Sequence, residues 1–298
     1  LAGDALTDSD KNVAVGYAAL TAETLGQFNV AIGRSALQAQ NNTTATDVYN
    51  VAVGYNAGAA VTTGSANTLV GGLAGDALTT GADNTALGYN SLGAGVASFY
   101  NTAIGKDALA SDTTGRHSVA VGRDALTAQN NTGSNDMYNV AVGSNAGASV
   151  TTGIQNTLIG GLAGDVLTDA DFNTAVGFQT LSTDTLGSKS TALGYNALSS
   201  QNFTTATDSF NVAVGYNAGV LVTTGTQNTL VGGEAGDALT TGTENVAVGK
   251  GALTTDDVGF QSTAVGAGAL TSQNIASAAS TYNSALGYQA GFYNITGT

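Results

Sequence analysis

A five-residue pattern of alternating apolar and polar positions recurs along the whole chain. It reads Asn-Val-Ala-Val-Gly at 12–16 and occurs 16 times, always ending on a glycine. Counting from that glycine, position −1 is Val, Ile or Leu in all 16 copies, −3 is Val or Thr in 15, and −2 is Ala in 13 and Leu in three. Position −4 is always Asn or Ser. Such alternation predicts a short strand with −3 and −1 on one face and −4 and −2 on the other.

The spacing of the motif glycines takes only two values, 17 and 21 residues. Four consecutive steps make a superunit of 72 residues, and one unit with an extra step spans 89 residues, from Gly54 to Gly143. Tandem periods of this size are typical of solenoid proteins. We therefore expect residues 1–298 to form a single continuous repeat domain. Because residues 1–6 match 73–78, we also expect the chain to be a mid-repeat window of a longer fibre chain.

The residues after the glycine predict how each turn is filled. Position +4 is Leu in nine turns and Gly in seven, and six of those seven carry an apolar residue at +7. Position +10 is Gly in nine of the 11 short turns, which indicates a corner with positive φ. We predict an all-β parallel β-solenoid, a β-roll of about 16–17 coils, in which each coil carries a second short strand and Asn or Ser at −4 forms an amide ladder. The interior is expected to hold −3, −1 and the apolar residue at +4 or +7, so Val142 should be buried.

The four 21-residue steps contain polar insertions. Because a wall built of 17-residue turns has no room for four more residues, we expect loops to bulge outward. An aromatic residue follows each insertion and should anchor the loop against the returning chain: these are Tyr49, Tyr138, Phe210 and Tyr282. The predicted loops are Gln40–Asp47, Gln129–Asp136, Gln201–Asp208 and Gln273–Ser280.

The motif at 118–122, Ser-Val-Ala-Val-Gly, and its fifteen relatives resemble the head repeat of trimeric autotransporter adhesins, whose consensus is Asn-Ser-Val-Ala-Ile-Gly. The longer form at 84–92, Asn-Thr-Ala-Leu-Gly-Tyr-Asn-Ser-Leu, is similar to repeats of phage tail-fibre proteins. The turns here are longer than those of the adhesin heads. The resemblance implies parallel β-rolls with three chains side by side about a long axis, at a bacterial surface or on a virion.

Composition and charge narrow the possible partners. Seven Lys and Arg against 21 Asp and Glu give a net charge of −14, which disfavours nucleic acid and anionic membranes. The chain has no Cys and no apolar run of 18 residues, so neither disulfides nor a membrane-spanning segment is expected. The single histidine, His117, has no marked nucleophile or acid partner, and no distinctive pair of carboxylates suggests glycan hydrolysis. We therefore expect the chain to have no enzymatic activity and to bind no cofactor.

Two sets of residues are candidate sites. Residues 71–78 are similar to the calcium-binding nonapeptide repeat, but copies lie 72 or 89 residues apart, so Asp76, Asp165 and Asp237 are weak calcium candidates that are better suited to capping turns. Position +1 carries a stripe of aromatic residues that are suited either to stacking on sugar rings or to packing on one another. This recognition stripe comprises Tyr17, Tyr55, Tyr89, Phe178, Tyr195, Tyr216 and Tyr288.

A homotrimer is the expected assembly. The row of Ala at −2 predicts a close seam between chains, and Leu at −2 occurs only where +1 is Gly, as packed positions that trade volume would do. The sequence alone allows two chains; the resemblance selects three. The leading function is the structural shaft of an extracellular or virion fibre that supports host attachment. The alternative is a bacterial surface adhesin whose roll binds glycan or matrix. An ice-binding solenoid is a third possibility, but the Thr pairs fall on only some turns.

Overall fold

The computed structural model describes residues 1–7, 9–131, 133, 136–275 and 277–296. It is all-β, and the described residues contain no helix. The chain is a parallel β-solenoid of 16 turns, and it comprises two compact units, Leu1–Thr152 and Gly153–Thr298, with eight motif strands in each. Among the described residues there is accordingly no helix of the length and apolarity that crossing a bilayer requires.

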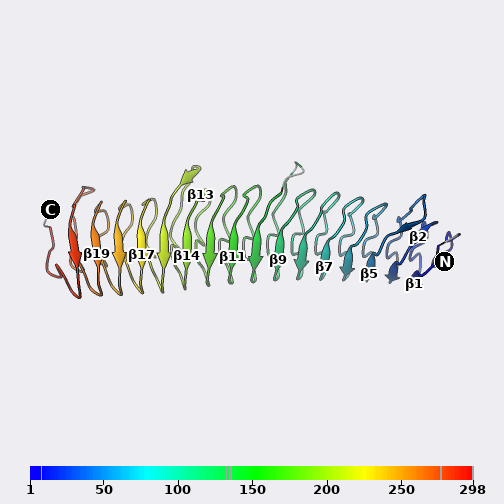
Figure 1. Cartoon of the computed structure of the whole chain (residues 1–298), viewed down its shortest axis with the longest axis horizontal. Coiled ribbons are helices and arrows are strands. Elements are labelled where there is room, and N and C mark those ends of the chain that lie inside the picture. The colour runs from blue at the N-terminus through cyan, green and yellow to red at the C-terminus, as the bar shows by residue number, and fades with distance from the viewer. Residues whose placement is uncertain (8, 132, 134–135, 276, 297–298) are drawn as a thin grey trace. The chain divides into compact units, whose positions relative to one another are not determined.

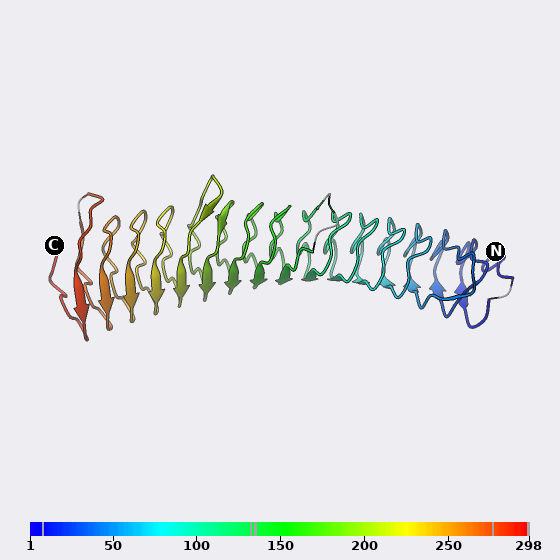
Figure 2. The ribbon, with the colours of Figure 1, turned by 45° about the horizontal axis from the view of Figure 1, so that its top comes forward.

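Each unit contains a parallel sheet of three-residue strands, one from each turn (Figures 1 and 2). Residues one turn apart pair at equivalent positions, as Val13 does with Val30. The strands of the first unit are β1 (Val13–Val15), β3 (Val30–Ile32), β5 (Val51–Val53), β6 (Thr68–Val70), β7 (Thr85–Leu87), β8 (Thr102–Ile104), β9 (Val119–Val121) and β10 (Val140–Val142). Those of the second are β11 (Thr157–Ile159), β12 (Thr174–Val176), β14 (Thr191–Leu193), β16 (Val212–Val214), β17 (Thr229–Val231), β18 (Val246–Val248), β19 (Thr263–Val265) and β20 (Ser284–Leu286).

A second strand in every turn was expected, and this is wrong for the described residues. Two-residue strands occur only at two of the long turns, where β2 (Gly26–Gln27) pairs with β4 (Thr46–Asp47) and β13 (Gly187–Ser188) pairs with β15 (Thr207–Asp208). Elsewhere the return path is a series of tight turns. Backbone bonds still join consecutive turns there, for example from Leu20 N to Ala36 O at 3.0 Å.

The interior of each unit lies on the face opposite to the predicted one. The residue at −2 is 0% exposed in the strands between the end ones, as Ala120 and Ala141 are, whereas Val121 and Val142 at −1 are only half-buried. The predicted burial of Val142, and of −3 and −1 in general, is therefore wrong. Each turn encloses only a narrow interior space. Small side chains face inward because Ala at −2 and Asn at −4 fit that space.

Burial of the Ala row within one chain also overturns the predicted Ala seam between chains. Leu at −2 does gain volume where a glycine of the same turn loses it, but that glycine is not the one at +1 that the sequence suggested. A Cβ on Gly75, at +4, would lie 2.8 Å from a methyl carbon of Leu69, at −2 of the same turn. Leu69 therefore fills the space that a leucine at +4 fills in other turns, and Gly72 at +1 plays no part in this trade.

The predicted apolar residues at +4 and +7 are confirmed as interior. Leu20 and Leu37 at +4, and Val61 and Leu78 at +7, are all 0% exposed. Position +4 has positive φ whether it is Leu or Gly, with φ near 51° at Leu20 and 56° at Gly75. This left-handed conformation explains why glycine replaces leucine there whenever another side chain fills the interior.

The amide ladder at −4 is confirmed. The Asn228 backbone N–H donates to Asn211 Oδ1 at 2.9 Å, and its side-chain Nδ2 donates to the same oxygen at 3.3 Å and to the carbonyl of Gly242 at 2.8 Å. The Asn245 N–H then donates to Asn228 Oδ1 at 3.0 Å. Each buried amide thus bonds to the backbone of the next turn and to the corner carbonyl of its own turn.

The corner glycines at +10 are required for a reason other than the expected one. Gly242 does not have positive φ, so the prediction of a left-handed corner is wrong. A Cβ at Gly242 would instead lie 2.6 Å from the carbonyl oxygen of Gly259 on the next turn. At five of the nine corner glycines the nearest atom to such a Cβ is a backbone oxygen of the next turn, whereas at Gly26, Gly115, Gly187 and Gly259 it is a carboxylate oxygen of the acid three residues earlier.

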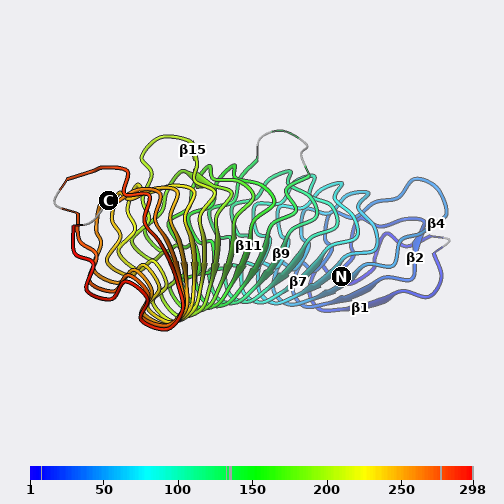
Figure 3. The same ribbon diagram turned by 60° about the vertical axis from the view of Figure 1, so that its left-hand side comes forward.

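The polar insertions project as loops, as predicted, in the later parts that the structure describes (Figure 3), but the predicted loop starts are wrong, because Gln40, Gln129, Gln201 and Gln273 are 0% exposed. Residues 43–47 and 204–206 are exposed, whereas residues 132, 134, 135 and 276 of the predicted loops lie outside the described residues. The predicted aromatic anchors are wrong, because all four are at least half exposed. The residue before each aromatic is the anchor and is 0% exposed: these are Val48, Met137, Ser209 and Thr281.

Candidate functional site

One face of each sheet is a regular surface that repeats on every turn. We call it the outer face; it consists of the −3 and −1 side chains of the motif strands. These are Val, Ile, Leu or Thr with one Ser, and several are well exposed, for example Leu87 at 46% and Ile32 at 38%. A sheet face of branched aliphatic side chains that stays partly in water is typical of an interaction surface.

Two rows of larger side chains border the outer face. The −5 row has positive φ in all 16 turns, from 50° at Tyr138 to 63° at Lys189, although none of its members is glycine. The +1 row follows the motif glycine on the other border. The −5 row comprises Lys11, Phe28, Tyr49, Ala66, Asp83, Tyr100, His117, Tyr138, Gln155, Phe172, Lys189, Phe210, Gln227, Glu244, Gln261 and Tyr282.

Rings within each row stack on one another from turn to turn. In the −5 row, Tyr100, His117 and Tyr138 have successive centroid distances of 4.9 and 5.0 Å and interplanar angles of 9° and 10°. Phe28 stacks on Tyr49 at 5.0 Å. The separation between turns thus brings equivalent rings into van der Waals contact, and their faces cover each other.

The recognition stripe predicted from the sequence lies in the +1 row. All seven members are exposed, from 45% at Phe178 to 77% at Tyr288. Phe178, Tyr195 and Tyr216 stack at 5.8 and 5.4 Å. Cations cover two further rings: Arg34 lies 5.6 Å from the Tyr55 centroid, and Lys106 lies 6.0 Å from that of Tyr89. Each of these five rings thus has at least one face against a neighbouring ring or cation, which reduces the ring face that is free to stack on a sugar.

A buried polar cluster at each long turn was missed from the sequence. Position +7 is an acid in the turn before each long turn and glutamine in the long turn itself. Glu23 is 0% exposed and accepts bonds from Gly26 N at 2.7 Å and Gln40 Nε2 at 2.8 Å. Gln40 Oε1 then accepts from Asn50 Nδ2 at 2.9 Å. The same arrangement recurs with Asp112 and Gln129, Asp184 and Gln201, and Asp256 and Gln273.

The pKa values of two acids of this cluster, Glu23 and Asp112, are shifted in opposite directions. Burial opposes ionisation of Glu23, but hydrogen bonds from Gln40, Asn42 and the backbone outweigh it and lower its pKa. Burial raises the pKa of Asp112, since Gln129 and backbone N–H groups only partly offset it. Deeper burial of Asp112 contributes first to this difference, and Asn42 adds to it: its Nδ2 donates to Glu23 at 2.9 Å, whereas the corresponding Asn131 turns its amide to Met137 Sδ.

Serine at −4 belongs to the same cluster. In three long turns the glutamine Nε2 also donates to it, at 3.1 Å for Ser118, 2.9 Å for Ser190 and 2.7 Å for Ser262. The fourth long turn has Asn29 instead, and its buried Nδ2 has no hydrogen-bond partner in the described structure. The Asn-to-Ser exchange at −4 was therefore a sequence signal of this cluster.

The weak calcium candidates lie in separate turns, and only Asp237 has another acid, Glu234, close enough to affect its pKa. Asp76, Asp165 and Asp237 are half-buried, and burial raises the pKa of each, partly offset by bonds from their own backbone N–H. Such bonds are those of a turn cap. In the described ranges no group of three or more His, Cys, Asp or Glu side chains gathers where it could hold a metal ion.

His117 is a member of the −5 stack, between Tyr100 and Tyr138. Its Nε2 lies 3.6 Å from Asp136 Oδ1, and both side chains are partly exposed.

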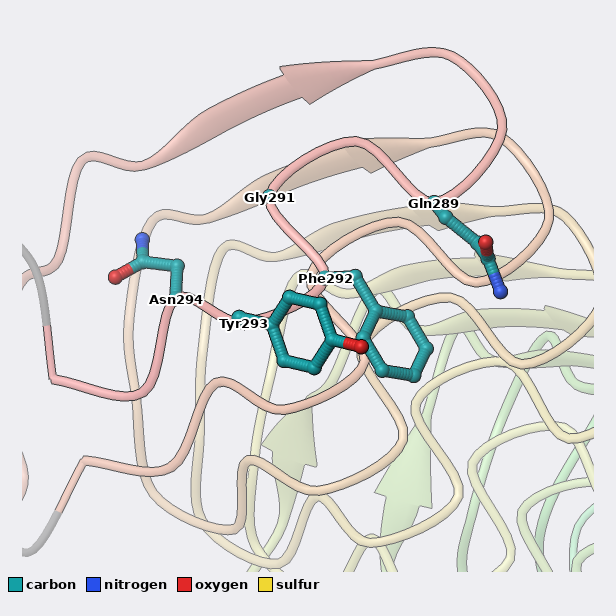
Figure 4. A pocket seen from close by; sticks show the side chains of 5 residues that line it. All are labelled: Gln289, Gly291, Phe292, Tyr293 and Asn294. Atoms are coloured by element: carbon teal, nitrogen blue, oxygen red, sulfur yellow. The ribbon is translucent and has the colours of Figure 1, made fainter.

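A hollow of about 540 Å³ lies in the last turn, where the Phe292 and Tyr293 rings meet edge to face at 5.0 Å and Gln289 points away from Asn294 (Figure 4). It is open to solvent, and the five described residues that line it are uncharged.

Comparison with known proteins adds no family. No protein-family model matches the chain, and no curated protein does.

Proposed function

We propose that the chain is the structural shaft of a homotrimeric extracellular fibre, on a virion or a bacterial surface, that supports host or surface attachment. The observation that carries this proposal is the outer face. It repeats on every turn of both units and is partly exposed, with Val, Ile or Leu at every −1 position and Val, Thr or Ser at −3, and it is bordered by two rows in which aromatic and charged side chains predominate.

The physical argument concerns what such a face needs. A lone chain would leave branched aliphatic side chains in water on turn after turn, whereas a solvent-facing strand normally carries charged or polar residues. Closed rotational symmetry covers all copies of the face with one kind of contact, and the resemblance noted above favours three copies. The solenoid then sets reach and stiffness, which is the task of a shaft.

The same structure favours a shaft over an adhesin that binds glycan along its roll. Glycan binding by aromatic residues uses exposed ring faces. In the stripe, five of the seven rings have at least one face against a neighbouring ring or cation. The +1 row is therefore better suited to packing than to recognition.

The experiment is the molar mass by light scattering over a dilution series. We expect three chains for the native sequence and a shift to monomers for Val176→Asp, which places a charge on the outer face. Thr205→Asp, on an exposed loop, makes the same kind of change away from that face and should leave the mass unchanged. A folded native chain that is monomeric at every concentration would refute the proposal.

A further inference from the structure

The two rows that border the outer face are complementary to each other, turn by turn. Six residues separate the −5 and +1 positions of a turn, and the strand between them holds their side chains roughly 15–20 Å apart, so they do not meet within one chain. Any relation between the residues at these positions therefore concerns contact with something else.

Charge is the first sign of this relation. Lys11 at −5 shares its turn with Tyr17 at +1, and Glu244 shares its turn with Lys250. In no turn do both positions carry Lys or Arg, and in no turn do both carry an acid. Cation–aromatic pairs also occur at Phe28 and Arg34, Tyr100 and Lys106, and Lys189 and Tyr195.

Size is the second sign. Where +1 is Gly, the −5 residue is Ala or Gln and never aromatic. Conversely, four turns have aromatics at both positions: Tyr49 with Tyr55, Phe172 with Phe178, Phe210 with Tyr216, and Tyr282 with Tyr288. In four turns a large ring thus faces a large ring, and in no turn does a ring face glycine, as expected for the two sides of a packed contact.

We infer that copies of this chain associate parallel and in register, with the −5 row of one copy against the +1 row of the next at the same turn. This inference rests on the trimeric shaft proposed above and specifies its seam. Because one row meets a different row, the contact is heterologous and closes by rotation. The three outer faces then point towards the common axis between the seams.

Register follows from the same residues. If the neighbour slipped by one turn in one direction, Lys11 would face Arg34, and Tyr49 and Phe210 would face Gly72 and Gly233. A slip in the other direction would set Phe172 against Gly161 and leave Glu244 without Lys250. The in-register arrangement avoids both like-charged pairs and aromatic rings opposite glycine, and neither one-turn slip avoids both.

Disulfide cross-linking tests the seam directly, because the native chain contains no cysteine. We would make Ala66→Cys together with Gly72→Cys, at the −5 and +1 positions of one turn. A disulfide requires Cα atoms about 4.4–6.8 Å apart, so the pair is able to close only between copies. Oxidation should produce a covalently closed trimer on a denaturing gel, and each single variant should stay uncross-linked.

The control displaces one cysteine along the shaft. Ala66→Cys with Ser144→Cys places the +1 cysteine four turns away, about 19 Å along the stack, and should not cross-link. Cross-linking by this pair would overturn the register, and dimers from either single variant would overturn the heterologous contact. A trimer by light scattering without any cross-link would overturn the seam and leave the proposed shaft standing. A monomer would overturn the shaft itself.

Charge exchange supplies an independent measurement. Glu244→Lys and Lys250→Glu should each weaken association at least about tenfold, since each creates a like-charged pair at the seam. The double exchange should restore most of the loss. If the double variant loses as much association free energy as the two single variants combined, the pairing is wrong, whatever the oligomeric state.

Discussion

Two adjacent residues of β9 test which side of the strand is the interior. Ala120 is 0% exposed, and its neighbours in the preceding and following turns, Ala103 and Ala141, are equally buried. Val121 points the other way and is half-buried. The substitutions Ala120→Asp and Val121→Asp introduce the same charge one residue apart, so any difference between them reports the direction of the side chain.

The expected magnitudes differ widely. Aspartate at 120 buries a carboxylate without a partner, which costs several kcal/mol, and its extra volume in a closely packed interior adds about 1–3 kcal/mol. A typical domain is stable by only about 5–15 kcal/mol, so the turns around β9 should open. Aspartate at 121 keeps its charge in water and should change the stability of a single chain by about 1 kcal/mol or less.

Hydrogen exchange of backbone amides in β8, β9 and β10 is the assay, because it reads the stability of these turns separately from the rest. We expect Ala120→Asp to abolish protection there and Val121→Asp to retain it, while light scattering shows Val121→Asp to be monomeric. Equal loss of protection in both variants, or loss only in Val121→Asp, would refute the assigned orientation.

Three further predictions follow from the interior contacts. Gly88→Ala should destabilise its turn by more than about 1–3 kcal/mol in thermal melts, because Gly88 has a φ of 141° and the new Cβ would lie 2.5 Å from Gly105 O; Gly72→Ala, whose Cβ would lie 3.6 Å from Tyr89, should be tolerated. Asn29→Ser should raise the unfolding midpoint, because the gain from removing a buried Nδ2 without a partner, as in the other long turns, should exceed the loss of the bond from Asn50 N–H to Asn29 Oδ1 at 3.2 Å; a lower midpoint would contradict this. In denaturant titrations, Glu23→Gln should be less stable than the native chain at neutral pH, and this difference should shrink as pH falls through the lowered pKa of Glu23. The raised pKa of Asp112 reverses the pH dependence. Asp112→Asn should therefore lose most stability in acid, and the loss should shrink as pH rises through that pKa.

The period, the fold class and the amide ladder could be predicted because they depend on residue identity repeated at fixed spacing. The direction of the strand could not. Val at −1 is more hydrophobic than Ala at −2, so the usual expectation places Val142 inside and Ala141 outside. That expectation assumes a lone chain with a wide core. Here the interior is narrow enough for Ala and Asn to fill it, and the larger aliphatic residues face outward.

The −5 row was not foreseen because its conformation leaves no mark in the sequence. Sixteen non-glycine residues with positive φ are unusual, and residues such as Phe28 and Tyr49 do not suggest a left-handed backbone. By contrast, the acid and glutamine at +7 were visible as a pattern. Their meaning became clear only when the structure placed each acid one turn below its glutamine and beside the loop.

That pairing has a consequence for how a nearly uniform repeat keeps its turns in order. Most turns present interchangeable side chains to their neighbours, so hydrophobic packing alone distinguishes poorly between one register and the next. If the turn of Glu23 stacked on the turn of Val61 instead of that of Gln40, the carboxylate would be buried against a methyl group. An unpaired buried charge costs several kcal/mol, more than any gain from apolar contact there. The buried acids therefore disfavour slipped stacking most strongly at the long turns, where the outward loops depend on correct neighbours.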